Sequence, residues 1–183
     1  MLVLSPLFFV LAVWIKCDSK GPVFYRQVRV GRNNRDFRLY KFRSMRVGSD
    51  KKGLITIGEH DPRVTRSGYY IRRYKLDELP QLINVFAGNM SLVGPRPEVR
   101  KYVDLYTPEQ MHVLDVRPGI TDLASIRYRN ENELLEQADD PDRYYVDVIM
   151  QDKLRINLEY VADHSFLKDI KLIGMTFRAI VSK

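Results

Sequence analysis

The chain has 183 residues, of which 45% are hydrophobic, so it is long enough to form one domain with a buried core. Its net charge of +7 and its pI of about 9.5 favour an anionic partner, such as a nucleotide, a nucleic acid or an anionic lipid. The single cysteine excludes an internal disulfide. The histidines lack the spacing of metal ligands; they are His60, His112 and His164.

The first element is an apolar run over residues 1–15, interrupted by Ser5 and Pro6 and ended by Lys16. A helix needs about 20 apolar residues to cross a bilayer, so this run is too short to span one. Because proline breaks a helix, we expect residues 1–16 to form a re-entrant helix that enters one leaflet and turns back at Ser5-Pro6. A helix buried in the protein core is the alternative.

A β-hairpin is predicted next. Residues 23–30 and 37–42 are rich in β-forming side chains, and the polar segment 31–35 separates them. This pattern indicates two strands joined by a loop of about five residues. The hairpin also alternates aromatic and basic side chains, an arrangement that can bind single-stranded nucleic acid. A nucleic-acid-binding module is therefore one alternative function.

Two adjacent carboxylates, Asp77 and Glu78, stand among basic residues. Such a pair is typical of a site for phosphate and Mg²⁺, since carboxylates hold the metal or attack phosphorus and guanidiniums bind phosphoryl oxygens. The alternative is an exposed helix start with ordinary surface ion pairs. The basic residues around the pair are Arg63, Arg66, Arg72, Arg73, Lys75 and Arg96.

The apolar spacing after this pair predicts a helix over residues 79–86 that ends at Gly88. Pro80 suits the first turn, where its missing N–H costs nothing. We therefore expect Asp77 at or next to the N-cap, where the helix dipole keeps a carboxylate ionised.

The remaining chain is predicted to be mostly helical. Thr107 and Gln110 have the spacing of a capping box, and a helical region over residues 131–160 should be interrupted near Pro141. Residues 166–180 carry an apolar stripe that we interpret as core-facing, with a basic amphipathic helix on a membrane as the alternative.

Several motifs follow one another in a fixed order. They are Ser5-Pro6, Gly21-Pro22-Val23-Phe24-Tyr25-Arg26-Gln27, Lys41-Phe42-Arg43-Ser44-Met45, Leu76-Asp77-Glu78-Leu79-Pro80-Gln81-Leu82, Gly94-Pro95-Arg96-Pro97 and Arg117-Pro118-Gly119-Ile120-Thr121. In this order they resemble the bacterial sugar transferase family, the small monotopic phosphoglycosyl transferases that start glycan assembly on polyprenyl phosphate. The resemblance covers nearly the whole chain.

The resemblance implies a reaction for the carboxylate pair. Asp77 matches the family's nucleophile, which attacks the β-phosphorus of a UDP-sugar, releases UMP and forms a covalent phosphosugar–aspartyl intermediate. The phosphosugar then passes to a polyprenyl phosphate such as undecaprenyl phosphate. Glu78 matches the Mg²⁺ ligand. The resemblance further implies phosphate-binding or basic-site roles for Arg72, Arg96, Arg129, Lys41 and Arg43.

The resemblance also implies an architecture. We expect an α/β fold, mostly helical with a small β-hairpin, in which residues 17–183 form a catalytic domain on the cytoplasmic face of a bacterial inner membrane. Residues 1–16 would be its monotopic anchor, incomplete here because the family usually carries a longer apolar stretch before Ser5-Pro6. Many members read Gly-Trp-Ala-Gln where this chain has Asp122-Leu123-Ala124-Ser125, so contacts to the substrate are expected to differ.

Two questions stay open in the sequence. A non-catalytic, membrane-associated member of the same fold is an alternative to an enzyme, although the intact Asp77-Glu78 pair argues against it. The sequence identifies neither the sugar nor the glycan pathway, which could be capsule, exopolysaccharide, O-antigen or glycoprotein assembly. A homodimer is also compatible with it.

Overall fold

The computed structural model describes residues 4–49, 53 and 61–181. The helices are α1 (Ser5–Asp18), α2 (Arg66–Arg73), α3 (Gln81–Phe86), α4 (Arg100–Val103), α5 (Leu123–Arg127), α6 (Glu131–Glu136), α7 (Pro141–Tyr144), α8 (Met150–Ala162) and α9 (Phe166–Val181). The strands are β1 (Phe24–Val30), β2 (Asp36–Phe42), β3 (Ser91–Val93) and β4 (Gly119–Thr121). Short 3-10 turns are η2 (Arg32–Asn34), η4 (Leu76–Glu78) and η5 (Gln110–Leu114), and η6 (Tyr145–Ile149) is a π-helical segment.

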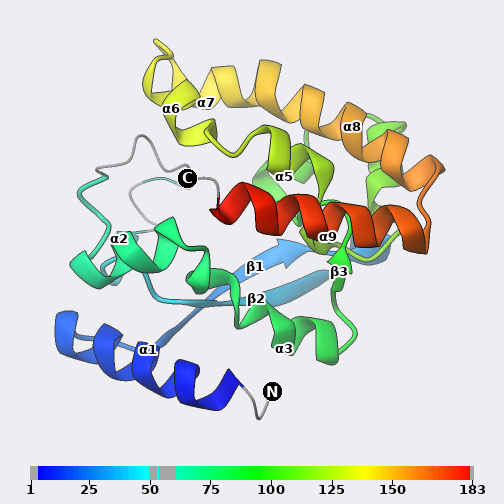
Figure 1. Ribbon diagram of the computed structural model, residues 1–183. Coiled ribbons are helices and arrows are strands. Elements are labelled where there is room, and N and C mark those ends of the chain that lie inside the picture. Colours follow the sequence, from blue (N-terminus) through cyan, green and yellow to red (C-terminus); the bar gives the residue numbers. More distant parts are fainter. Residues whose placement is uncertain (1–3, 50–52, 54–60, 182–183) are drawn as a thin grey trace.

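The fold is the mostly helical α/β arrangement that the sequence predicted, and the hairpin is confirmed. Strands β1 and β2 pair antiparallel, with Phe24 opposite Phe42 and Val30 opposite Asp36. Figure 1 shows α1 on one side of this hairpin and the group α5 to α9 on the other. The segment from α2 through η4 to α3 runs between them, so the chain around Asp77 lies in the middle of the molecule.

A second, parallel strand pair was not predicted. Strand β3 pairs with β4, with Ser91 beside Gly119. The two segments approach so closely that a Cβ atom on Gly119 would lie 2.2 Å from the backbone nitrogen of Gly94. Only glycine allows this approach, which gives a physical reason for the glycines in Gly94-Pro95-Arg96-Pro97 and in Pro118-Gly119. The pair fixes the loop that carries Arg96.

The N-terminal apolar run forms α1, but its course differs from the expected one. Pro6 lies in the first turn of α1 and does not interrupt the helix. Residues 1–3, where an arm before Ser5-Pro6 would lie, are outside the described part of the chain, so the re-entrant course stays a prediction. Within the described residues, none of the helices is long and apolar enough to span a bilayer.

One face of α1 packs on the domain and the other is exposed. Leu11 and Ile15 are buried against Phe42 of β2 and Ile71 of α2. The buried-core alternative therefore holds for only one side of the helix. The exposed apolar side chains of α1 are Leu7, Phe9, Val10, Val13 and Trp14.

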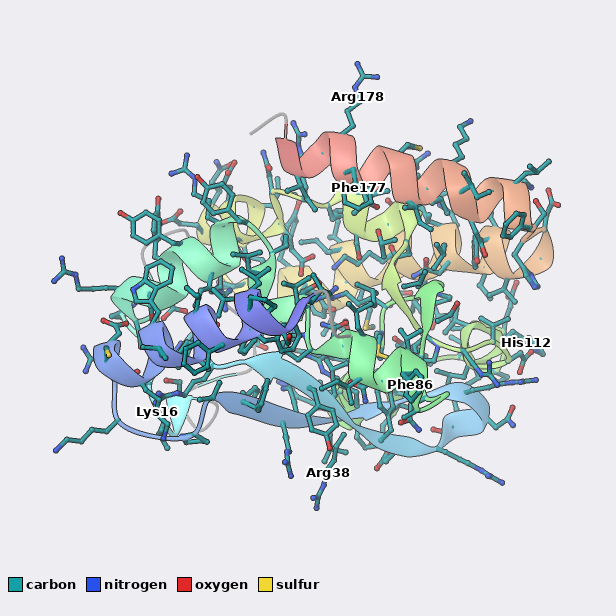
Figure 2. The ribbon with its side chains drawn as sticks, turned by 60° about the horizontal axis from the view of Figure 1, so that its bottom comes forward. Lys16, Arg38, Phe86, His112, Phe177 and Arg178 are labelled. Atoms are coloured by element: carbon teal, nitrogen blue, oxygen red, sulfur yellow. The ribbon has the colours of Figure 1, made fainter. Side chains whose placement is uncertain are left out.

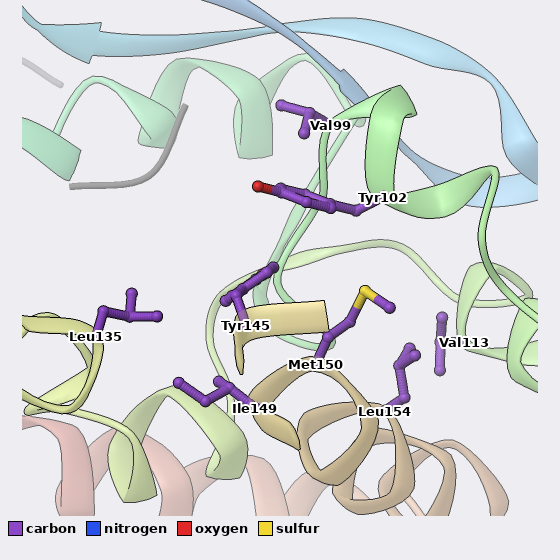
Figure 3. Packing of buried hydrophobic residues seen from close by; sticks show 8 residues of the cluster. All are labelled: Val99, Tyr102, Val113, Leu135, Tyr145, Ile149, Met150 and Leu154. Atoms are coloured by element: carbon purple, nitrogen blue, oxygen red, sulfur yellow. The ribbon is translucent and has the colours of Figure 1, made fainter. Parts of the chain in front are cut away.

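A second hydrophobic cluster holds the helices on the opposite side together. Figure 3 shows it as a group of side chains from α4, η5, α6, η6 and α8, in which Tyr102 and Tyr145 lie close to each other. Their ring centroids are 4.9 Å apart. Its buried members are Val99, Tyr102, Val113, Leu135, Tyr145, Ile149, Met150 and Leu154.

Two further predictions about this half of the chain are confirmed. The backbone nitrogen of Gln110 donates to Thr107 Oγ1 at 3.2 Å, and the backbone nitrogen of Thr107 donates to Gln110 Oε1 at 3.0 Å, which is a reciprocal capping box. The helical region of residues 131–160 is interrupted before Pro141, which begins α7.

The predicted core-facing stripe of α9 is wrong. Phe166 and Phe177 are 77% and 66% exposed, and only Leu172 on this helix is fully buried among its described side chains. In Figure 2, Arg178 projects from α9 away from the body of the molecule. Phe166, Ile170 and Phe177 of the predicted stripe are therefore exposed, and the membrane-surface alternative remains open.

The cluster between α1 and the hairpin yields a test of stability. Phe42 is 1% exposed, and its ring centroid lies 5.0 Å from that of Phe8 and 5.3 Å from that of Phe24. Phe42→Ala should lower the free energy of unfolding by about 3–5 kcal/mol, measured by denaturant unfolding. The control Phe86→Ala removes a side chain that is 90% exposed and should change it by no more than about 0.5 kcal/mol. Equal effects of the two substitutions would contradict this packing.

Candidate active site

Twelve charged residues line a cleft of about 320 Å³ at η4. The cleft is bordered by the hairpin, α2, the loop after β3 and the segment after α5, so residues far apart in the sequence meet there. Cations outnumber carboxylates on its walls, which suits a polyanionic ligand. Its charged residues are Arg29, Lys41, Arg72, Arg73, Lys75, Asp77, Glu78, Arg96, Glu98, Arg129, Glu131 and Lys153.

Asp77 lies in η4, ahead of α3, and is 7% exposed. The N-cap of α3 is Pro80, so the predicted N-cap position of Asp77 is wrong and a helix dipole does not account for its charge. The turn is made by Lys75 in the left-handed conformation, with a φ of 56°. Asp77 Oδ1 is buried and has no hydrogen-bond partner within the described residues. Burial and the neighbouring Glu78 raise the pKa of Asp77.

Glu78 is held by two cations. Arg96 donates to both carboxylate oxygens, with Nη1 at 3.3 Å from Oε2 and Nη2 bonded to Oε1. Lys41 Nζ donates to Oε1 at 3.5 Å. Burial alone would raise the pKa of Glu78, but the positive charges of Arg96 and Lys41 outweigh it and hold this pKa well below its usual value. Glu78 is therefore ionised, and its charge is oriented by a bidentate guanidinium.

Lys41 approaches Glu78 from the hairpin side of the cleft. It lies on β2, and burial lowers the pKa of its ammonium to about 8, although Glu78 opposes this shift. The negative charges of Glu78 and Asp77 oppose this shift and partly compensate for the burial of the ammonium group. The structure thus brings Lys41 to the carboxylate pair, as the sequence predicted.

Arg72 and Arg129 also reach the cleft. Arg72 comes from the last turn of α2, and Arg129 follows α5. Arg129 is exposed, and no hydrogen bond or ion pair joins it to the described part of the chain. Its guanidinium is available to an anionic ligand.

Arg43 lies elsewhere. Its guanidinium donates to the backbone oxygens of Ile15, Ser19 and Lys20 at the end of α1, and the residue is 4% exposed. It lines a neighbouring hollow of about 390 Å³ that shares Lys41, Arg72 and Asp77 with the cleft. These contacts give Arg43 structural partners at the end of α1, and its predicted role at the basic site stays a prediction.

Sequence reasoning missed Asp122, which positions the loop of Arg96. Asp122 is 1% exposed, and its Oδ2 accepts a hydrogen bond from the backbone nitrogen of Arg96 at 2.9 Å. Its carboxylate also accepts from the backbone nitrogen of Ser125, which caps α5. Burial raises the pKa of Asp122. The sequence signal that could have identified Asp122 was its position after Thr121, where this chain departs from the residues that the resemblance led us to expect.

A second missed group supports the wall of the cleft. Glu98 accepts from Arg29 Nη1 at 3.3 Å and from Tyr145 Oη at 2.6 Å. Arg29 Nη2 in turn donates to Gln27 Oε1 at 2.8 Å. Burial, reinforced by Glu98, raises the pKa of Tyr145 well above its usual value, so the phenol is neutral and donates. The network joins β1 to η6 across the cleft.

The carboxylate pair fits a magnesium ion that is shared with a substrate. Among the residues that the structure describes, no three carboxylate, histidine or cysteine side chains converge as a complete metal cage. Mg²⁺ commonly binds to one or two carboxylates and completes its shell with water and substrate phosphates. Glu78, which lies in the cleft next to Asp77, could supply such a carboxylate. The donor set fits Mg²⁺ only together with a phosphate ligand.

The sequence of the whole chain matches one family. A model of the family described as bacterial sugar transferase matches residues 1–183. The chain belongs to the bacterial sugar transferase family. The carboxylate pair and the cations of the cleft are thus features of a sugar transferase.

Several relatives of this sugar transferase have been named. It is 40% identical over 181 residues to the UDP-N-acetylgalactosamine-undecaprenyl-phosphate N-acetylgalactosaminephosphotransferase of Aeromonas hydrophila, covering 97% of this chain and 40% of that protein. It is 37% identical over 188 residues to the UDP-glucose:undecaprenyl-phosphate glucose-1-phosphate transferase of Escherichia coli (strain K12), covering 100% of this chain and 38% of that protein. It is 38% identical over 175 residues to the uncharacterized sugar transferase EpsL of Bacillus subtilis (strain 168), covering 96% of this chain and 77% of EpsL. The chain thus spans less than half the length of the first two relatives.

The contacts of Asp122 yield a test in this sugar transferase. Asp122→Ala should lower the free energy of unfolding by about 1–3 kcal/mol, because the buried N–H groups of Arg96 and Ser125 lose their acceptor. Denaturant unfolding measures this change. The control Asp115→Ala removes a carboxylate that is 63% exposed and should cost no more than about 0.5 kcal/mol. If Asp122→Ala were as mild as the control, the carboxylate would not hold the Arg96 loop.

Proposed function

We propose that this sugar transferase moves a phosphosugar from a UDP-sugar to a polyprenyl phosphate such as undecaprenyl phosphate, and releases UMP. The observation that carries the proposal is the buried Asp77 beside a partly buried Glu78 in a cleft lined by cations. Both characterised relatives above are named for transfer from a UDP-sugar to undecaprenyl phosphate, which supports the same substrate classes here.

Asp77 would act as the nucleophile of the first step. Its Oδ1 has no hydrogen-bond partner in the described protein, so it can approach phosphorus without breaking an internal contact. In that step an Asp77 oxygen bonds to the β-phosphorus while the bond from this phosphorus to the bridging oxygen breaks. UMP leaves with the bridging oxygen and the electron pair. In the second step an oxygen of the lipid phosphate bonds to the phosphorus, and the carboxylate of Asp77 leaves.

The other charged residues of the cleft would bind the negatively charged phosphoryl groups in these steps. Arg72 and Arg129 are placed to bind phosphoryl oxygens, and Lys41 and Arg96 hold Glu78 beside the reacting group. We propose that Glu78 helps to hold Mg²⁺ when the diphosphate is bound. The ion would neutralise the negative charge of the diphosphate. All four cations would be drawn toward a ligand that carries more negative charge than Glu78 alone.

We further propose that the enzyme acts as a monotopic protein at the cytoplasmic face of a bacterial inner membrane. The apolar side chains on the outer face of α1 support this, because they stay exposed on the described domain, with Phe9 70% and Val10 60% exposed. Polyprenyl phosphate is itself a membrane lipid, so the site must lie near a bilayer. In this proposal residues 1–16 belong to the anchor and residues 17–183 form the catalytic domain, and the product would begin a bacterial glycan.

The nucleophile proposal predicts the effect of Asp77→Asn. Turnover, measured as UMP release from a panel of UDP-sugars with polyprenyl phosphate, Mg²⁺ and detergent, should fall by at least about a thousandfold, because an amide is a poor nucleophile. Intact mass spectrometry should show a phosphosugar adduct on the wild type and none on the variant. The exposed control Asp115→Asn should keep both. Retention of turnover by Asp77→Asn would refute the assignment, and a wild type without UMP release would favour a non-catalytic member.

The role of Glu78 is tested with Glu78→Gln. Loss of one anionic oxygen ligand should slow UMP release and raise the Mg²⁺ concentration that gives the half-maximal rate. The exposed control Glu109→Gln should leave the Mg²⁺ titration unchanged. A slower rate with an unchanged titration would mean that Glu78 orients Arg96 and does not hold the metal.

A further inference from the structure

The end of α1 is fastened to the domain by two polar contacts, which we call the α1 latch and define as Asp18, Gly21, Arg43 and Ser67. The first contact is that of Arg43. Its Nη2 donates to the backbone oxygen of Ser19 at 2.8 Å and to that of Ile15 at 3.4 Å, and its Nη1 donates to that of Lys20. The guanidinium thus binds carbonyl groups at the end of α1 and in the turn that follows it, and its charge complements the negative end of the helix dipole.

The second contact of the latch joins α1 to α2. Asp18 is the last residue of α1, and its Oδ2 accepts from the backbone nitrogen of Ser67 at 2.9 Å and from Ser67 Oγ at 2.8 Å. Ser67 lies in the first turn of α2, whose last turn carries Arg72 into the cleft and which runs directly into η4. The end of α1 is thus connected to the segment that carries Asp77.

The turn after α1 is shaped to admit the Arg43 side chain. Gly21 has a φ of +130°, and a Cβ atom at this position would lie 2.6 Å from Arg43 Nη1 and 2.6 Å from Val47 Cγ2. Any other residue would push the guanidinium off the carbonyl groups and strain the backbone. Four residues from three separate parts of the chain therefore form the two contacts of the latch.

The latch lies beside the carboxylate pair along one strand. At the end of β2, Lys41 donates to Glu78, Phe42 packs on Leu11 and Ile15 of α1, and Arg43 caps the same helix. A shift of α1 relative to β2 would therefore move the strand that carries Lys41. The latch joins the exposed apolar helix and the reacting groups by a short, rigid path.

We propose that the α1 latch is a positioning device that sets the height and tilt of the membrane-facing helix relative to Asp77, so that a phosphate carried by a membrane lipid reaches the site. The inference rests on the proposed function, and it assigns Asp18 and Arg43 as positioning residues for the lipid substrate. A soluble UDP-sugar diffuses into the cleft and does not depend on the helix. The lipid phosphate is held in the bilayer, so its reach depends on where the bilayer lies.

The test separates the two half-reactions in Asp18→Ala. UMP release in a single burst, without lipid, reports the step with UDP-sugar, and steady-state transfer in vesicles reports the step with polyprenyl phosphate. In Asp18→Ala the KM for polyprenyl phosphate should rise by about tenfold, because small misplacements at a reacting centre are costly. The burst rate should stay within about twofold of the wild type. An equal loss in both half-reactions would make the contact merely structural and overturn the proposal.

Arg43→Gln and Arg43→Lys give the second arm. If the latch is the role of Arg43, Arg43→Gln should raise the KM for the lipid, and Arg43→Lys, which keeps a charged donor, should restore part of it. A slower burst with an unchanged KM for the lipid would return Arg43 to phosphate binding and overturn its assignment. The matched control is Arg38→Gln, which changes an exposed arginine of β2, seen in Figure 2 projecting from the hairpin.

A readout that needs no activity distinguishes failure of the latch from failure of the proposed function. Cys17 is the only cysteine, is exposed and lies next to Asp18 at the end of α1. A spin label on Cys17 should become more mobile in Asp18→Ala and Arg43→Gln and stay unchanged in Arg38→Gln. Unchanged mobility in the first two variants would refute the latch. A mobile label together with a wild type that releases no UMP would confirm the contact and refute both the proposed function and the lipid-positioning role.

Discussion

The buried ion pair of Glu78 with Arg96 is the interaction on which the rest of the site depends. Burying a carboxylate is costly, and the cost is offset here by a bidentate guanidinium and a lysine. The adjacent Asp77 shares the burial but has an oxygen without a partner in the described protein. Two neighbouring carboxylates are therefore made chemically different by their surroundings: burial shifts the pKa of Asp77 upward, whereas cations shift that of Glu78 downward.

This charge arrangement requires a scaffold that fixes three separate segments. Arg96 is held by the β3–β4 pair and by Asp122, Lys41 by the hairpin, and the carboxylate pair by the turn at Lys75. The segments of Lys41 and Asp77 pack on the cluster between α1 and the hairpin through Phe42 and Leu76. Members of the other cluster, among them Val99 and Tyr145, line the cleft. Hydrophobic packing in the two clusters thus offsets the free-energy cost of bringing so many charges together.

Packing within the domain does not explain the exposed outer faces of α1 and α9. Both helices expose large apolar side chains, although both are well formed in the structure. Such faces are expected where a protein contacts a lipid or another protein. The α1 latch gives the exposed helix α1 a fixed relation to the cleft, so that a surface contact and a chemical step can be linked.

The sequence by itself determined the features that depend on neighbours along the chain: the hairpin, the Thr107 capping box, the break at Pro141 and the Asp77–Glu78 pair amid cations. Local sequence patterns predict these features because the contacts that form them join residues close together along the chain. Only the tertiary structure decided which cations meet the pair. Lys41 lies on β2 and Arg43 follows its last residue, Phe42. Lys41 nevertheless reaches Glu78, whereas Arg43 binds the end of α1. Likewise the N-cap of α3, the β3–β4 pair, the role of Asp122 and the exposed face of α9 depend on contacts between distant segments, which no local pattern encodes.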